Sequence, residues 1–310
     1  MRSSFLPANG FLLLLLTQNK KQPIQSAGPV KSEERDAGGS ENFEAFYECV
    51  GANYPEEDLV YRSLRGMVRK RFVEYHIKTT EGTFLDLGCN RGGYICNYAK
   101  GRAIGVDISL PVLKIARARP SEGNLHFVRG DAQNLSFLRS NSIDFILCSE
   151  MIEHVPRPQS VFAECLRVLR TGGKLLVTTP NYKRNKPAWV PIGEMAKYGV
   201  AGVHGNLYFH TAFRPEELEQ MAKKTGFSTM ITGTFEKEVK YATRLPVIFF
   251  YFIRSLNRFT LNNARLDRLN NRFLDEFSLI IYKFCVRFGL NALLTRLVTE
   301  GVRSYLIAQK

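Results

Sequence analysis

The sequence is short of several features that would assign it to a common class of protein. It has only six cysteines, and no two of them form a C-x-x-C pair. This distribution argues against a disulfide framework and against a zinc site, and it favours a reducing compartment. No apolar run reaches the roughly 20 residues that a membrane-spanning helix needs, and the chain contains no internal repeat.

Acidic residues are outnumbered by basic ones. Lys and Arg total 43 against 29 Asp and Glu, which gives a net charge of +14 and a pI near 9.6. Such an excess suggests an anionic partner, which a nucleic acid, a membrane surface or an acidic substrate would provide. A hydrophobic content of 45% over 310 residues is enough for one sizeable core and a smaller appendage.

A glycine-rich stretch between Thr83 and Tyr94 has the sequence TFLDLGCNRGGY. Its apolar start, Phe84–Leu87, is too brief for a helix and predicts a buried parallel strand. A glycine turn follows, and residues 94–99 are then expected to start a helix. A strand, a glycine turn and a helix in this order are typical of the opening of a nucleotide-type α/β domain.

Two phosphate-binding loops do not fit this turn. A G-x-G-x-x-G loop would have a second glycine at position 90, where the chain has Asn90. A Walker loop would have Lys followed by Ser or Thr where Tyr94 and Ile95 stand. Asn is nevertheless one of the few residues other than glycine that tolerate the left-handed backbone conformation of such a turn.

Strands and helices continue to alternate along the chain. Strands are expected at 102–108, 125–128, 142–148, 174–178 and 227–233, and helices at 55–78, from Ser109 onward, at 159–169 and at 215–225. This order predicts an α/β, doubly wound, mostly parallel sheet with ligands at the carboxyl ends of its strands. Residues 182–210 are irregular and are expected to form a functional loop or lid.

Five motifs in this region resemble one known family. They are FLDLGC at 84–89, GVDIS at 105–109, GDA at 130–132, EMIEHV at 150–155 and LRTGGKL at 169–175. From 84 to 234 the chain is similar to the UbiE/UbiG-type branch (methyltransferase family 11) of class I S-adenosylmethionine (SAM) methyltransferases. Asn90 replaces one glycine of their D-x-G-x-G-x-G signature. The resemblance implies SAM as cofactor, a seven-stranded Rossmann-like sheet with one antiparallel strand in its last pair, and in-line methyl transfer.

Acids end three successive strands of the predicted sheet. Asp107, about 20 residues after the first turn, is placed to take both ribose hydroxyls. Asp131 is placed to accept from the adenine amino group beside the N–H of Ala132, and Asp86 to hold the positively charged methionine end. Singly, each acid is as readily a turn cap. The predicted cofactor-binding residues are Asp86, Gly88, Asn90, Gly92, Asp107, Ile108, Asp131, Ala132 and Ser149.

Glu150, Glu153 and His154 follow the fourth strand at helical spacing, so on a helix they would share one face. A histidine titrates near neutrality, which suits a general base for a phenol or similar hydroxyl. We therefore predict His154 and Glu150 as catalytic residues and no metal. Two alternatives stay open, namely that the trio holds a divalent metal, as the resemblance suggests, or that it only stabilises the helix start. His204 and His210 are lesser candidates.

The two ends of the chain differ from the middle. Residues 1–42 are predicted to be a flexible N-terminal extension, because polar residues and prolines dominate 18–42. The apolar run Phe11–Leu16 hints at a signal peptide, but it is too short and no A-x-A site follows. The SAM-dependent methyltransferase domain is predicted at 43–236, between this extension and a second one at the C-terminal end.

Residues 237–310 carry 13 Lys or Arg against 5 Asp or Glu and are predicted to be a basic, amphipathic helical extension. Aromatic residues beside basic ones suit an anionic membrane surface. Packing on the sheet domain, or a dimer surface, is an equal alternative, and RNA binding a lesser one. No oligomeric state is predicted.

The predicted function is SAM-dependent methyl transfer to a small-molecule or lipidic acceptor, at oxygen in preference to carbon or nitrogen. Nucleic acid is disfavoured as the acceptor, because no [DNS]-P-P-[YFW] motif follows the fourth strand and no cysteine follows a proline. The alternatives are a catalytically silent SAM-fold binding protein and an RNA-binding or RNA-modifying protein. The predicted location is the cytoplasm, with peripheral attachment to the inner membrane face as an option.

Overall fold

The structure is a computed structural model that describes residues 40–55, 60, 63–120, 123–182 and 188–310. The extension predicted at 1–42 therefore lies almost entirely outside the described residues. The same holds for parts of the helix expected at 55–78 and of the loop expected at 182–210.

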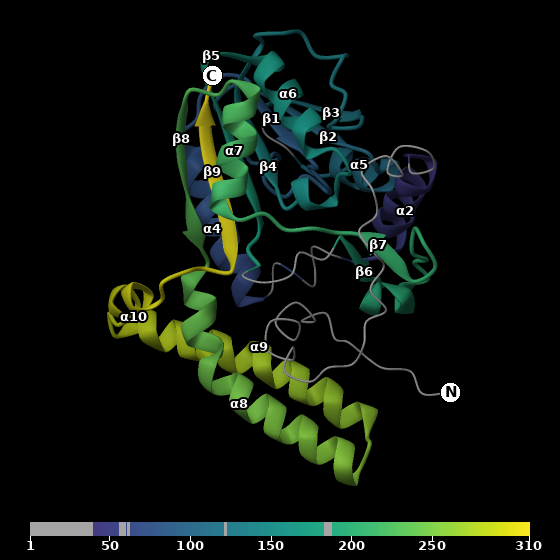
Figure 1. Ribbon diagram of the computed structural model, residues 1–310, viewed down its shortest axis with the longest axis vertical. Helices are drawn as coiled ribbons and strands as arrows, with labels where there is room; N and C mark the ends of the chain where they lie inside the picture. The colour runs from purple at the N-terminus through teal and green to yellow at the C-terminus, as the bar shows by residue number, and fades with distance from the viewer. Residues whose placement is uncertain (1–39, 56–59, 61–62, 121–122, 183–187) are drawn as a thin grey trace.

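A seven-stranded sheet forms the centre of the domain, in the order β3-β2-β1-β4-β5-β9-β8 (Figure 1). The parallel strands are β1 Phe84–Leu87, β2 Arg102–Asp107, β3 Asn124–Arg129, β4 Ile143–Ser149 and β5 Leu169–Pro180. The other two are β8 Thr229–Phe235 and β9 Arg303–Gln309, and β9 is antiparallel to both its neighbours. The doubly wound, mostly parallel α/β sheet is therefore confirmed.

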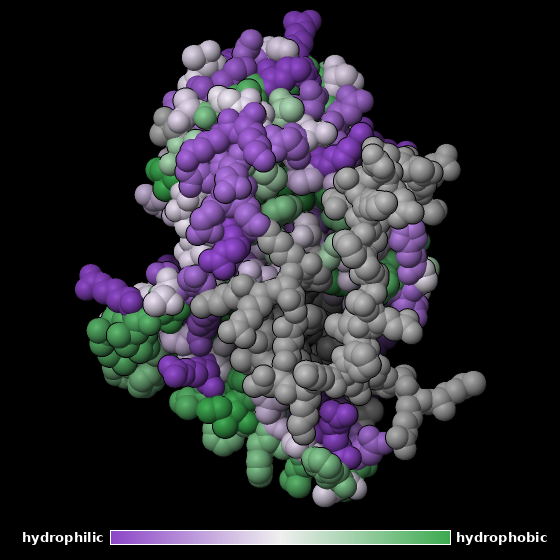
Figure 2. Space-filling view, in the orientation of Figure 1, coloured by the Kyte–Doolittle hydropathy of each residue, from purple (hydrophilic) through white to green (hydrophobic). Residues whose placement is uncertain are grey.

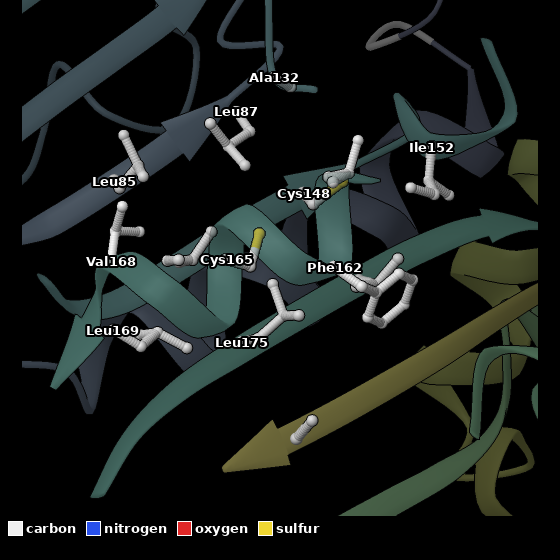
Figure 3. Close-up of a cluster of buried hydrophobic side chains, with 14 of the residues drawn as sticks. Leu85, Leu87, Ala132, Cys148, Ile152, Phe162, Cys165, Val168, Leu169 and Leu175 are labelled. Carbon is white, nitrogen blue, oxygen red and sulfur yellow. The ribbon is translucent and has the colours of Figure 1, made fainter. Parts of the chain in front are cut away.

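Helices cover both faces of this sheet. The described helices are α2 Ser40–Asn53, α4 Leu64–Lys78, α5 Leu110–Arg117, α6 Pro158–Val168, α7 Pro215–Thr225, α8 Lys237–Thr260, α9 Ala264–Arg287 and α10 Asn291–Leu297. The last three do not cover the sheet but project away from it (Figure 1). Neighbouring residues of a strand face opposite sides of a sheet, so Leu85 packs in one core with α6 and α7, while Phe84 packs in another with α4. Figure 3 shows the first core, where Phe162 and Cys165 of α6 lie near Leu175 of β5.

The strand β9 comes from the segment predicted to be a helical extension. It hydrogen-bonds to β5 along one edge and to β8 along the other. The prediction that 237–310 is wholly helical and separate from a domain at 43–236 is therefore wrong at its end. Helices α8, α9 and α10 are an insertion between β8 and β9, and the last residues of the chain complete the sheet. The sequence analysis missed β9 because its alternating pattern is only seven residues long and follows long stretches with helical spacing.

Two smaller segments also differ from expectation. After the glycine turn, residues 91–97 form consecutive turns, with the Cys96 N–H donating to the Gly92 carbonyl over 3.1 Å. The helix expected to start at residues 94–99 is therefore absent from this described segment. The region predicted to be irregular holds a hairpin of β6 Trp189–Pro191 and β7 Leu207–Phe209, and the 3-10 helix η2 Gly193–Tyr198.

The described helices were also compared with the length and apolarity that crossing a membrane requires. Among the described residues, no single helix meets these requirements. The segments Arg265–Arg287 and Asn291–Leu297 meet them only as a pair, and that pair is bent by 115°.

Candidate active site

A cavity of about 500 Å³ opens at the carboxyl ends of the parallel strands. This edge is where open α/β sheets bind their ligands. The sequence-predicted residues that line it are Gly88, Asn90, Asp107, Ile108, Asp131, Ala132, Glu150 and His154. The other three predicted residues, Asp86, Gly92 and Ser149, do not line it. The cavity therefore brings together most of the predicted site.

Asp107 is held in place by the backbone of the glycine turn and of the following helix. Its Oδ2 accepts the Asn90 N–H at 2.8 Å, and its Oδ1 accepts the Ser109 N–H at 2.9 Å. Asn90 takes the left-handed φ of 48°, which asparagine tolerates better than most residues. Burial raises the pKa of Asp107, although these backbone donors oppose the shift. Each oxygen retains acceptor capacity for a diol.

Asp131 is fixed by Gln133. Its Oδ1 accepts the Gln133 N–H at 2.9 Å, and its Oδ2 accepts the Gln133 side-chain amide at 3.0 Å. The Gln133 Oε1 in turn accepts the Arg157 N–H at 3.1 Å. Asp131 therefore closes a local turn, as the simpler interpretation expected, and also faces the cavity.

Asp86, Gly92 and Ser149 lie behind the cavity lining. Asp86 is buried within β1, its Oδ2 has no hydrogen-bond partner among the described residues, and burial together with the charge of Asp107 raises its pKa. Gly92 supports the turn, since a Cβ there would lie 2.8 Å from the Cys96 Sγ. Ser149 hydrogen-bonds to Thr178 at 2.9 Å. Their roles as direct cofactor contacts stay predictions.

Glu150 belongs to an ion-pair network and not to the helical face that the sequence predicted. It has a left-handed φ of 54° and precedes the short 3-10 helix η1 Ile152–His154. Its Oε2 lies 2.6 Å from Arg303 Nε and 3.3 Å from an Arg69 guanidinium nitrogen. Burial alone would raise the pKa of Glu150, but these two arginines outweigh it and lower the pKa. A carboxylate held in this way is a poor proton acceptor.

His154 meets Glu153 and His210 instead. One ligand-type atom from each of the three lies within 4.8 Å of the other two. Burial lowers the pKa of His154 to about 4, against the opposing charge of Glu150. Burial likewise lowers the pKa of His210 and raises that of Glu153. Near neutral pH the cluster therefore consists of two neutral imidazoles and a carboxyl group that resists ionisation.

Aromatic rings enclose this cluster. Tyr208 stacks on His154 with ring centroids 6.2 Å apart, and Tyr47 meets the same imidazole edge-on at 5.7 Å. Tyr182 and Val190 also line the cavity at this end. The polar groups of the cluster thus face a mostly apolar chamber, which suits a ligand that is apolar apart from one polar end.

Helix α2 forms a wall of the cavity that the sequence-based reasoning missed. Phe43, Phe46, Tyr47 and Val50 all line the cavity, and their i, i+3, i+4, i+7 spacing is the signal that would have revealed the helix. The helix packs tightly on the start of α5, since a Cβ on Gly51 would lie 2.1 Å from the Ser109 Oγ. The sequence-based reasoning also missed Arg69 and Arg303 at the site, and it did not place His210 beside His154.

Comparison with known proteins agrees with this geometry. A family model described as a methyltransferase domain matches residues 85–177. The chain is 30% identical over 204 residues to the ubiquinone biosynthesis O-methyltransferase of Idiomarina loihiensis, which covers 62% of this chain and 80% of that protein. The protein of the same name from Saccharophagus degradans is 27% identical over 190 residues, or 59% of this chain and 79% of the relative.

The chain belongs to the class I SAM-dependent methyltransferases of the UbiG/UbiE type. SAM is its cofactor, and the enzyme class predicted from the motifs is confirmed. Among solved structures, a SAM-dependent methyltransferase from Thermotoga maritima superposes with a TM-score of 0.46 at 20% identity, over 87% of this chain and 99% of the other.

Proposed function

We propose that this methyltransferase transfers the methyl group of SAM to a phenolic hydroxyl of a small, amphipathic acceptor of the quinol type. The observation that carries the proposal is the placement of neutral His154 in an aromatic chamber that is continuous with the Asp107 end of the same cavity. The names of the UbiG-type relatives, which refer to ubiquinone biosynthesis and O-methylation, support the acceptor class.

The residues of the cofactor half fit SAM. When bound, SAM supplies an electrophilic methyl group on a sulfonium. Asp107 would accept the ribose hydroxyls, because both its oxygens are oriented by backbone donors and keep free acceptor capacity. Asp131 and Ala132 would hold the adenine edge. The turn itself requires glycine at position 88, where φ is 70° and a Cβ would lie 2.7 Å from Met151.

In the acceptor half, His154 would take the proton of the hydroxyl as it attacks. Its imidazole is neutral near pH 7 and reaches the cavity, whereas Glu150 is occupied by two arginines. The aromatic walls would align the acceptor and exclude water, so most of the rate enhancement would come from positioning. The oxygen would lose its proton to His154 while the new C–O bond forms and the bond between the methyl carbon and the sulfonium sulfur breaks, which would leave S-adenosylhomocysteine as the neutral leaving group.

A second mode of activation is favoured by the geometry of Glu153, His154 and His210. A carboxyl group and two imidazoles that converge within 4.8 Å fit a divalent cation. The charge of the cation would favour the ionised form of Glu153, against the burial that raises its pKa. The Glu153 Oε2 and the His154 Nδ1 also have no hydrogen-bond partner among the described residues. A cation held here would lower the pKa of an acceptor hydroxyl, and His154 would then serve as a ligand. The sequence predicted a site without a metal, and a bound cation is the alternative to that prediction.

Incubation of the full chain with SAM and a panel of catechols, hydroquinones and amines tests the proposed function. We expect a product 14 daltons heavier from the phenolic compounds, with a preference for those carrying an apolar tail, and none from the amines. Parallel reactions with EDTA, and with Mg²⁺ or Zn²⁺ restored, decide between the two modes of activation. SAM binding without any product would instead support the catalytically silent alternative.

Replacement of Asp107 by alanine tests the cofactor half. We expect the dissociation constant for SAM to rise by about 10- to 100-fold, because a charge-assisted hydrogen bond contributes about 1.5–3 kcal/mol. Calorimetric titration measures the effect. The matched control is Asp267→Ala, which removes a carboxylate from α9 and should leave SAM binding unchanged. An unaltered affinity in Asp107→Ala would show that Asp107 only caps the turn.

A further inference from the structure

We propose that the inserted helices α8, α9 and α10 are a docking surface for membranes that contain anionic lipids. Figure 1 shows α8 and α9 as a helical hairpin that projects below the sheet. Along α8, large apolar residues are exposed at i, i+3, i+4, i+7 and i+11, which is one face of a helix. They are Leu245, Ile248, Phe249, Phe252 and Leu256.

A second apolar row runs along α9, where Leu269, Phe273, Ile280 and Phe284 are exposed. Phe249 directly precedes the buried Phe250 of α8, and Phe273 directly precedes the buried Leu274 of α9. One residue turns a helix by about 100°, so both rows are rotated in the same sense from the buried rows. In an antiparallel hairpin that rotation puts the two exposed rows on the same side.

This docking face is continued by α10, where Leu293 and Leu297 are exposed, the latter at 72%. Figure 2 shows hydrophobic residues gathered over α10 and around the lower end of the molecule, where the hairpin lies. Monomeric soluble proteins rarely expose so many large apolar residues on one element, and such patches mark interaction sites.

The charge of the insertion selects the partner. Between Lys237 and Leu297 the chain has eleven Lys or Arg and four Asp or Glu. Lys283 and Arg287 are exposed and lie three residues after Ile280 and Phe284 of the apolar row. Cations at the margin of an apolar helix face favour anionic headgroups. A second copy of the chain pressed onto the same face would instead bring these cations together, so we assign the face to a lipid surface.

The hairpin also lies next to the active site. Asp275 of α9 lines the cavity, and it follows Phe273 by two residues, or about 200° around the helix. One side of α9 therefore borders the cavity while the other carries the apolar row. A membrane bound at that row would be separated from the cavity by the thickness of one helix. If the proposed acceptor class holds, an amphipathic acceptor would reach His154 from the bilayer past α9.

Vesicle flotation of the full chain tests the docking face. With phosphatidylcholine vesicles that contain phosphatidylglycerol, we expect the wild type to float, and Phe252→Glu to weaken partitioning by about tenfold or more. The matched control is Tyr75→Glu on α4, because Phe252 and Tyr75 are each 67% exposed. Lys283→Glu combined with Arg287→Glu should weaken binding roughly thirtyfold, whereas Lys114→Glu combined with Lys224→Glu should have a much smaller effect.

Each result has one consequence for the docking face. Failure of the wild type to float, or flotation of Phe252→Glu equal to that of the wild type, overturns the proposal. Sedimentation that shows a dimer broken by Phe252→Glu, without vesicle binding, assigns the face to a second copy of the chain. Calorimetric SAM binding equal to that of the wild type shows that a variant is folded. Vesicle binding is measured without acceptor, so it stands or falls separately from the proposed methyl transfer.

Discussion

Replacing His154 by alanine should reduce kcat by about 10²- to 10³-fold while leaving the affinity for SAM unchanged. General bases contribute about 10²- to 10⁴-fold, and a base of low pKa lies at the weaker end of that range. The pKa of His154 is lowered to about 4 by burial. Steady-state kinetics with a catechol acceptor, together with calorimetric titration of SAM, separates loss of proton transfer from loss of cofactor binding.

The control for this variant is His204→Ala. His204 is exposed and contacts Trp189 with ring centroids 4.5 Å apart, and it does not line the cavity. The two substitutions remove the same side chain, one from the cavity lining and one from outside it, so only His154→Ala should lose activity. If His154→Ala kept more than half of the wild-type kcat, the proton would have to leave by another route.

The pH dependence of kcat/KM gives a readout that a merely structural histidine would not move. The active form of the base is the neutral imidazole, which predominates above its pKa. Because burial lowers that pKa from the usual value near 6.5 to about 4, activity should stay level as the pH falls through 6.5 and decline only toward pH 4. A limb near 6.5 in the wild type would show that His154 is more solvated than its surroundings indicate.

Local patterns were sufficient to predict the half of the fold that carries the proposed SAM site. Each of the first five strands contains a short run rich in apolar residues. Asp107 is the last residue of β2, and Asp131 follows the end of β3 by two residues. In a parallel sheet the ends of neighbouring strands are neighbours in space. A residue's position along the chain therefore fixed its place at the edge of the sheet, and both acids were correctly brought to one cavity.

The acceptor half depends on contacts between distant segments, which no local pattern encodes. His210 reaches His154 because the β6–β7 hairpin folds back over η1, and Arg303 reaches Glu150 only because β9 pairs with β5. Glu150 and His154 are four residues apart, as on one face of a helix, but their side chains do not share a helix face in the structure. The backbone turns to the left-handed region at Glu150 and separates the two side chains.

Replacing Arg69 by methionine should lower the free energy of unfolding by about 3–5 kcal/mol, the loss expected when one partner of a buried ion pair is removed. Arg69 is only 8% exposed, and its Nε lies 3.0 Å from the Glu236 Oε1. The Glu236 side chain is fully buried, so the variant would leave that carboxylate in the interior without its ion pair to Arg69. Urea unfolding followed by circular dichroism measures the difference.

The matched control is Lys70→Met, on the same helix. Lys70 is exposed and lies 3.7 Å from Glu74, and an exposed pair of this kind contributes about 0.3–0.5 kcal/mol. The double variant Arg69→Met with Glu236→Gln should recover part of the loss, because it also removes the stranded charge. If Arg69→Met were no less stable than Lys70→Met, the network would not be what anchors the start of α8 to the active site. Since Glu236 directly precedes α8 and Arg69 also contacts Glu150, loss of this arginine should loosen the docking hairpin and the acceptor end of the cavity together.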